Sequence, residues 1–207
     1  MNTNSITYYQ LILDASGSMS NIRIETLNAV NHQIEAIREL AVKNADQPIR
    51  VSLTVFNTDT HKVFSRLSPD KVNLLTMRQY KTDGGTALLD AIGLSLSDLQ
   101  ESTGPEDDVV MLIITDGEEN SSQYFSFKQI AGKIRALKKT ERWTFSFLGA
   151  DIDAWSIARN LHIDMDEVQS IERQDMPRAM EKTVSLMEDY IVRKRAGIRD
   201  GFMKDRS

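Results

Sequence analysis

The chain has 207 residues, of which 41% are hydrophobic and 27% charged, with 10 glycines and 4 prolines. This composition fits one folded domain and excludes a largely disordered or repetitive chain. The absence of cysteine excludes disulfides, thiolate nucleophiles and cysteine-based zinc sites. The formal charge of −5 argues against general binding to nucleic acid or to anionic membranes.

Two further features predict where the protein resides. The longest apolar run, Val109–Ile114, is too short to cross a membrane. The first residues lead into a strand-like stretch without the basic and apolar segments of a secretory signal. We therefore expect a cytoplasmic protein that does not bind membranes.

Strand-like and helix-like segments alternate along the chain. The apolar and aromatic run Ile6–Leu13 predicts a strand that stops at Asp14. Apolar residues three or four apart in residues 21–44 predict an amphipathic helix. The β-branched stretch Val51–Phe56 and the more polar stretch Lys62–Leu67 predict two hairpin strands, the second at a sheet edge.

The second half of the chain continues this alternation. Val109–Thr115 is apolar on both faces, which predicts a central parallel strand covered by helices on each side. The other predicted elements are a short helix beginning at Ser68-Pro69-Asp70, a helix after Gly85, helix 126–139, strand 143–148, helix 153–160, strand 166–171 and a closing helix 176–191.

This order predicts a Rossmann-like, doubly wound α/β sheet, mostly parallel, with helices on both faces. We expect a single domain over residues 1–196 and a basic C-terminal tail over residues 197–207. In such sheets ligands bind beyond the carboxyl ends of the strands. The residues that follow each strand are therefore the candidate functional residues.

Oxygen-bearing side chains follow two of these strands and precede one helix. Asp14-x-Ser16-x-Ser18 follows the first strand, Thr86 stands after two glycines before a helix, and Asp116 follows the central strand. Each loop alone could equally be a helix cap or a turn. Together they offer carboxylates and hydroxyls without nitrogen or sulfur, which is the donor set that Mg²⁺ or Mn²⁺ prefers.

These residues resemble the metal-ion-dependent adhesion site (MIDAS) of von Willebrand factor type A (vWA) domains. The stretches GGTALLDAI, ITDGEENSS and FLGADIDA are especially similar to standalone vWA proteins of bacteria and phages. The resemblance implies a six-stranded sheet with one antiparallel edge strand and Mg²⁺ at its top, with Mn²⁺ or Ca²⁺ able to substitute.

The resemblance also assigns roles at the site. It implies that the hydroxyls of Ser16, Ser18 and Thr86 ligate the metal directly or through water, and that Asp14 and Asp116 act mostly through water. One coordination position stays open for a carboxylate from a partner protein. The expected function is therefore metal-bridged protein recognition, not enzyme catalysis, and nucleic acid is not expected as the partner.

Two other functions stay open from the residues alone. A phosphatase of the haloacid-dehalogenase type also has an aspartate after the first strand, but it needs a second acid two residues later, where this chain has Ser16. A scaffold that binds partners without metal is the other alternative.

Five further polar residues could line the rim of the site, although the acids among them could equally be solvated loop residues. They are Asp59, Asp83, Glu118, Asn120 and Asp151. The basic residues from Arg193 onward predict a mobile tail, for which an acidic partner or nucleic acid is an alternative role.

Overall fold

The computed structural model of the protein describes residues 5–151, 154–198 and 200–203. Its single sheet has six strands in the spatial order β3-β2-β1-β4-β5-β6. The strands are β1 (Thr7–Asp14), β2 (Ile49–Phe56), β3 (Thr60–Leu67), β4 (Asp108–Thr115), β5 (Trp143–Ala150) and β6 (Val168–Ile171). The α-helices are α1 (Arg23–Lys43), α2 (Leu88–Gln100), α3 (Phe127–Lys138), α4 (Ala154–Asn160) and α5 (Met176–Arg195).

All neighbouring strands are parallel except β2 and β3, which form an antiparallel hairpin at one edge. The predicted doubly wound, mostly parallel sheet is therefore confirmed. The strand order reverses between β1 and β4, so the chain leaves these two neighbours toward opposite faces. In doubly wound sheets ligands bind beyond the carboxyl ends of two such strands, which here end at Asp14 and Thr115.

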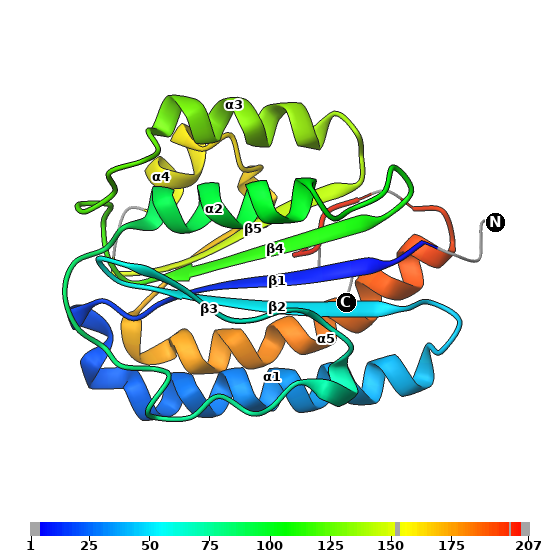
Figure 1. Ribbon diagram of the computed structural model, residues 1–207, viewed down its shortest axis with the longest axis horizontal. Helices are drawn as coiled ribbons and strands as arrows, with labels where there is room; N and C mark the ends of the chain where they lie inside the picture. Colours follow the sequence, from blue (N-terminus) through cyan, green and yellow to red (C-terminus); the bar gives the residue numbers. More distant parts are fainter. Residues whose placement is uncertain (1–4, 152–153, 199, 204–207) are drawn as a thin grey trace.

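The helices cover both faces of the sheet. Figure 1 shows α1 and α5 on one face and α2, α3 and α4 on the other. Each face has its own core cluster: Leu11 and Leu13 of β1 pack on the α1/α5 side, and Ile12 packs on the opposite side. Because both faces are covered, β1 and β4 are buried at every position. None of the described helices is long and apolar enough to cross a membrane.

Several element boundaries differ from those expected, and in two places a 3₁₀ segment precedes the element. The helix expected from residue 21 begins at Arg23, because the 3₁₀ helix η1 (Gly17–Ile22) first carries the chain away from β1. The strand expected from Asp166 begins at Val168, after a 3₁₀ turn, η3 (Met165–Glu167). The first residue of the expected helix 153–160, Asp153, lies outside the described residues.

The C-terminal segment differs more strongly from the expected tail. Phe202 and Met203 are buried, and the ring of Phe202 lies 6.1 Å from that of Tyr9 and 5.9 Å from that of Tyr190. Burial of these apolar side chains favours packing of residues 200–203 onto the domain. The packed chain therefore extends beyond the boundary expected at residue 196.

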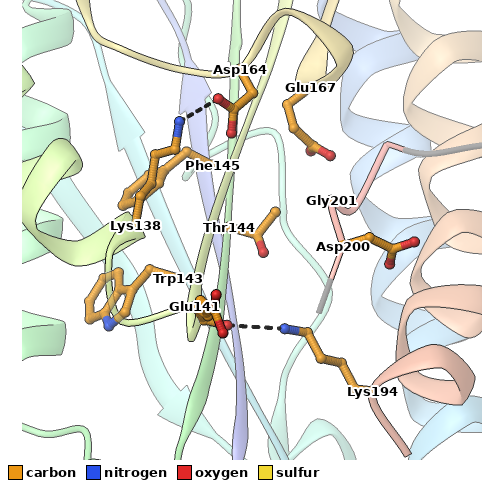
Figure 2. A pocket seen from close by; sticks show the side chains of 10 residues that line it. All are labelled: Lys138, Glu141, Trp143, Thr144, Phe145, Asp164, Glu167, Lys194, Asp200 and Gly201. Atoms are coloured by element: carbon orange, nitrogen blue, oxygen red, sulfur yellow. Dashed lines mark hydrogen bonds and ion pairs between the residues drawn. The ribbon is translucent and has the colours of Figure 1, made fainter. Parts of the chain in front are cut away.

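The basic residues expected to begin a mobile tail are also packed. Arg193 is buried and lies 3.3 Å from Asp200, and its guanidinium donates to the carbonyl of Gly201. Lys194 is buried 3.7 Å from Asp108. Figure 2 shows the pocket at the amino ends of β4 and β5, where Lys194 also reaches the backbone carbonyl of Glu141. The volume of this pocket is about 150 Å³. These two cations are therefore structural parts of the domain.

Candidate metal centre

The carboxylate of Asp14 is buried where β1 ends. Its Oδ1 accepts a hydrogen bond of 2.6 Å from the backbone N–H of Ser16, and its Oδ2 accepts one of 2.5 Å from the hydroxyl of Thr115. Burial raises the pKa of Asp14 to about 6, against the opposing effects of these hydrogen bonds. The site therefore holds an acid whose ionised form would gain from a nearby cation.

The two serines of the first loop lie beside this acid. Ser16 is buried and Ser18 is exposed, and their hydroxyl oxygens are 3.0 Å apart. The hydroxyl of Ser18 also donates a hydrogen bond of 2.5 Å to Oδ1 of Asp116. Because Ser18 and Asp116 are 98 positions apart in the chain, this contact joins the loop after β1 to the loop after β4.

The loop that carries Thr86 is attached to both of these loops. Asp83 donates its backbone N–H to the carbonyl of Ala15, and Thr86 exchanges hydrogen bonds with Asn120. A Cβ atom on Gly117 would stand only 2.7 Å from Oγ1 of Thr86, so this hydroxyl lies tightly against the residue after Asp116. The three segments predicted to converge therefore do converge at this end of the sheet.

Asp116 has two different neighbours. Its Oδ1 accepts from Ser18, and its Oδ2 lies 2.6 Å from Nε of Arg173, an ion pair. The Arg173 N–H is not directed at the oxygen, so neither atom has an aligned hydrogen-bond partner among the described residues. Burial raises the pKa of the Asp116 carboxyl, whereas Ser18 and the charge of Arg173 lower it.

Arg173 is a site residue that the sequence analysis missed. It lies in η4 (Arg173–Asp175), two residues after β6 ends at Ile171. Since β6 is parallel to β5, the residues after it reach the same edge of the sheet as Asp116. Because ligands bind beyond the carboxyl ends of parallel strands, inspection of the residues after the short and polar last strand would have found Arg173.

The five expected rim residues have different environments. Asp151 accepts a hydrogen bond from the backbone N–H of Arg173, and Asn120 holds Thr86. The carboxylate of Asp83 accepts a hydrogen bond from the backbone N–H of Gly84. The other two are Asp59 in the β2–β3 turn and Glu118 after β4, and all five side chains are exposed. Asn120 and Asp151 thus contact site residues, which fits a supporting role.

Two acids of this region are structural. Glu119 accepts hydrogen bonds from the backbone N–H groups of Leu89, at the start of α2, and of Ser121 and Ser122. Asp90 accepts three more from residues 123–125. Glu119 therefore fixes the loop after β4 onto α2 and so holds Asp116 in place.

The donor set of the site consists only of oxygen. Among the described residues no group of three or more His, Cys, Asp or Glu side chains could hold a metal ion. The centre around Asp14 and Asp116 has two carboxylates, so any cation bound there would depend on the hydroxyls as well. Hydroxyl and carboxylate oxygens suit a hard divalent cation such as Mg²⁺ or Mn²⁺.

The fold and this site define a class: a Rossmann-like domain with a hydroxyl and carboxylate cluster at the carboxyl ends of its strands. Residues 10–119, about half of the chain, match the family model of the von Willebrand factor type A domain. The chain therefore belongs to the vWA family. Domains of this family are generally adhesion and interaction modules. No curated protein sequence matches the chain.

Solved structures with the same fold include three from different organisms. Proximal thread matrix protein 1 from the mussel byssus, with a zinc-occupied MIDAS motif, is 18% identical (TM-score 0.57; 90% of this chain, 46% of that chain). The ArnB paralog VWA2 from Sulfolobus acidocaldarius is 19% identical (TM-score 0.56; 86% and 45%). Manganese-loaded TRAP protein from Plasmodium vivax is 15% identical (TM-score 0.57; 88% and 74%). The chain spans less than half the length of the first two, and the likeness shows the fold alone.

Proposed function

We propose that this chain is a metal-dependent protein-binding module. Its site would hold Mg²⁺, or Mn²⁺ or Ca²⁺ in its place, and would bind an acidic residue of a partner protein. The contact that carries the proposal is the Ser18 hydroxyl, which bonds to both Ser16 and Asp116. The proposed ligands, direct or through water, are Asp14, Ser16, Ser18, Thr86 and Asp116.

The residues present fit such a cation. Two neighbouring ligands of an octahedral Mg²⁺ at about 2.1 Å are about 3 Å apart, and the hydroxyls of Ser16 and Ser18 are separated by 3.0 Å. Oδ2 of Asp116 is buried without an aligned hydrogen-bond donor. Two buried carboxylates beside one partly exposed arginine leave negative charge that a divalent cation would neutralise. A zinc-occupied MIDAS motif in one structure of this fold, and manganese in another, support a divalent cation here.

The chain's own residues have separate tasks in this proposal. Asp14, Ser16 and Thr86 are buried and would hold the inner side of the site, whereas Ser18 is exposed and leaves it open to solvent. When bound, the cation would supply a positive centre that attracts a carboxylate of the partner. Glu119 and Asn120 fix the loops and so preserve the arrangement when a partner binds.

The surroundings of Asp14 argue against phosphatase chemistry. A nucleophilic aspartate must present an oxygen to its substrate, but Asp14 is buried and both of its oxygens accept hydrogen bonds. Ser16 occupies the position where that mechanism needs an acid and base. We therefore propose that the chain is not an enzyme. That it is a standalone bacterial or phage protein and acts in the cytoplasm stays a prediction from the sequence.

Mn²⁺ titration of the whole chain tests the proposal. The variant Ser18→Ala removes the exposed hydroxyl of the cluster, and we expect about tenfold weaker Mn²⁺ binding by calorimetry, as for loss of one charge-assisted contact. Ser20→Ala is the matched control, because Ser20 is an exposed serine of the same loop whose hydroxyl bonds, within the described part of the chain, to Gly17 and Thr82. This control should bind Mn²⁺ as the natural chain does.

The open position is tested with the Mn²⁺-loaded protein. Bound Mn²⁺ speeds the relaxation of water protons that exchange at its open positions, and a glutamate-containing peptide should reduce this effect by displacing that water. The same peptide with glutamine should leave the relaxation unchanged. Failure of the natural chain to bind Mn²⁺ or Mg²⁺ at millimolar concentration would favour the metal-independent scaffold.

A further inference from the structure

The guanidinium of Arg173 stands at the proposed metal centre. Its Nε is 2.6 Å from Oδ2 of Asp116, an oxygen that is buried at the carboxyl end of the sheet. Arg173 itself is partly exposed, with 29% of its side-chain surface accessible. The chain thus supplies a positive charge of its own to the carboxylate that the proposed function assigns to the metal.

The contact between these two groups is close but poorly aligned. Neither Nε of Arg173 nor Oδ2 of Asp116 has an aligned hydrogen-bond partner among the described residues. A well-fitted arginine–carboxylate pair would form two parallel hydrogen bonds. The guanidinium therefore neutralises Asp116 through a close ion pair in which Nε–H is not aligned with the carboxylate oxygen.

Asp151 gives Arg173 a second anchor. The backbone N–H of Arg173 donates a hydrogen bond of 3.0 Å to Oδ1 of Asp151, and its Nη2 lies 3.6 Å from Oδ2 of the same acid. Asp151 is exposed, whereas Asp116 is buried. The side chain of Arg173 can therefore leave Asp116 and stay paired near the surface while its backbone remains in place.

A divalent cation and this guanidinium oppose each other electrostatically. Both would be attracted to Asp116, and like charges a few ångströms apart in a partly buried site repel each other strongly. The buried carboxylate gains from a positive neighbour, but the second positive charge adds repulsion as well as attraction. Occupation of the site by a cation therefore favours withdrawal of Arg173.

We propose that Arg173 is an internal counter-ion of Asp116 that competes with the divalent cation and shifts toward Asp151 when the cation binds. The inference rests on the proposed function, and it makes Arg173 a positioning residue that sets the metal affinity of the site. The site would then bind its cation more weakly than the donor set alone allows. Only a sufficient concentration of divalent cation would open the site to a partner's carboxylate.

Substitution of Arg173 separates this inference from the proposed function. We expect Arg173→Gln to bind Mn²⁺ at least about tenfold more tightly than the natural chain, because the competing charge is gone. In EDTA the same variant should unfold at a lower temperature, because Asp116 loses its counter-ion. A general gain or loss of folding stability would not produce these two opposite changes together.

Arg142→Gln is the matched control. Arg142 is similarly exposed and forms an ion pair of 2.7 Å with Glu106, but it lies just before β5, at the opposite end of the sheet. Its substitution should leave Mn²⁺ affinity unchanged. Should Arg173→Gln fail to fold in EDTA, Arg173→Lys is measured in its place. Lysine keeps the charge but not the planar guanidinium, so we expect this variant to bind Mn²⁺ about threefold more tightly than the natural chain.

The possible results have distinct meanings. If the natural chain binds Mn²⁺ and Arg173→Gln binds it equally or more weakly, the inference is overturned and the proposed function stands. The same holds for equal binding in Arg173→Lys where Arg173→Gln does not fold. Absence of Mn²⁺ binding in the natural chain and in every variant would overturn both. Tighter binding in Arg173→Gln and an unchanged Arg142→Gln would support the inference.

Discussion

The two ends of the sheet bury charge in different ways. At the amino end of β6, Glu167 is buried and accepts hydrogen bonds from the hydroxyl of Ser146 and from the backbone N–H of Met203. At the carboxyl end of β4, Asp116 is equally buried, but one of its oxygens faces the misaligned Nε of Arg173. Glu167 thus has aligned hydrogen-bond donors, whereas one oxygen of Asp116 has none among the described residues.

This difference indicates a folding role for the acid at one end of the sheet and a binding role for the acid at the other. A buried charge is costly unless it is paired and hydrogen-bonded, so an acid with directed partners, such as Glu167, fits a role in holding the fold. An incompletely satisfied acid beside the exposed Ser18 fits a role that needs a further positive group. We therefore expect changes at the end near Phe202 to alter folding, and changes at Asp116 to alter metal binding.

The largest expected effect on folding comes from Phe202→Ala. The ring is buried between Tyr9 and Tyr190, so its removal should lower the free energy of unfolding by about 3–5 kcal/mol. Chemical denaturation measures this change, and Ile198→Ala, at a partly exposed position of the same segment, is the control. A change below about 1 kcal/mol would mean that residues 200–203 do not pack on the domain in solution.

The largest expected effect on binding comes from Asp116→Asn. The amide oxygen can still accept from Ser18, but without the charge Mn²⁺ affinity should fall at least about 100-fold, or about 2.7 kcal/mol. The free energy of unfolding in EDTA should change little. Asp98→Asn, at an acid that pairs with Lys62 and Arg66, is the control. Unchanged Mn²⁺ binding in Asp116→Asn would remove this end of the sheet as the metal site.

The smallest expected effect is a pH dependence from Glu167. Burial raises the pKa of Glu167 to about 7 from its ordinary value of 4.5. The folded state therefore binds a proton more readily than the unfolded state, and its contribution to stability is present below pH 4.5 and is lost as the pH rises through 7. The loss should amount to about 1–3 kcal/mol between pH 5 and pH 8.

Glu167→Gln isolates this effect, because glutamine cannot ionise. The difference in unfolding free energy between the natural chain and this variant should change with pH over that window, in the direction of a relatively more stable variant at pH 8. Denaturant titrations at several pH values in EDTA measure it. A difference that is constant from pH 5 to pH 8 would show that Glu167 does not titrate in this range.

Most of the fold was predictable because its signals are local. The apolar stretch Val109–Thr115 needs both faces covered, and β4 is buried at every position. The helix expected from Ser126 begins at Phe127, with Ser126 as its cap and Gln129 completing a capping box. Strand and helix boundaries moved by a few residues where 3₁₀ turns, which leave little trace in periodicity, join the elements.

The candidate site was predictable for a related reason. Residues that directly follow parallel strands must meet at one edge of the sheet, so the positions of Asp14 and Asp116 brought them together once the strands were recognised. The role of Glu119 was not predictable in this way, because its partner Leu89 is 30 residues distant and no periodic pattern connects them. A solvated acid and an acid that holds a loop look alike in a sequence.

The sequence by itself determined the order of strands and helices and the oxygen-bearing residues at the strand ends. It did so because the alternation of apolar segments and turn residues acts over a few neighbouring positions. Only the tertiary structure decided that Arg173 faces Asp116 and that Phe202 returns to pack beside Tyr9. These contacts join residues 57 and 193 positions apart (173 − 116 and 202 − 9). Charge attraction and apolar burial depend on distance in space, and the folded sheet sets that distance.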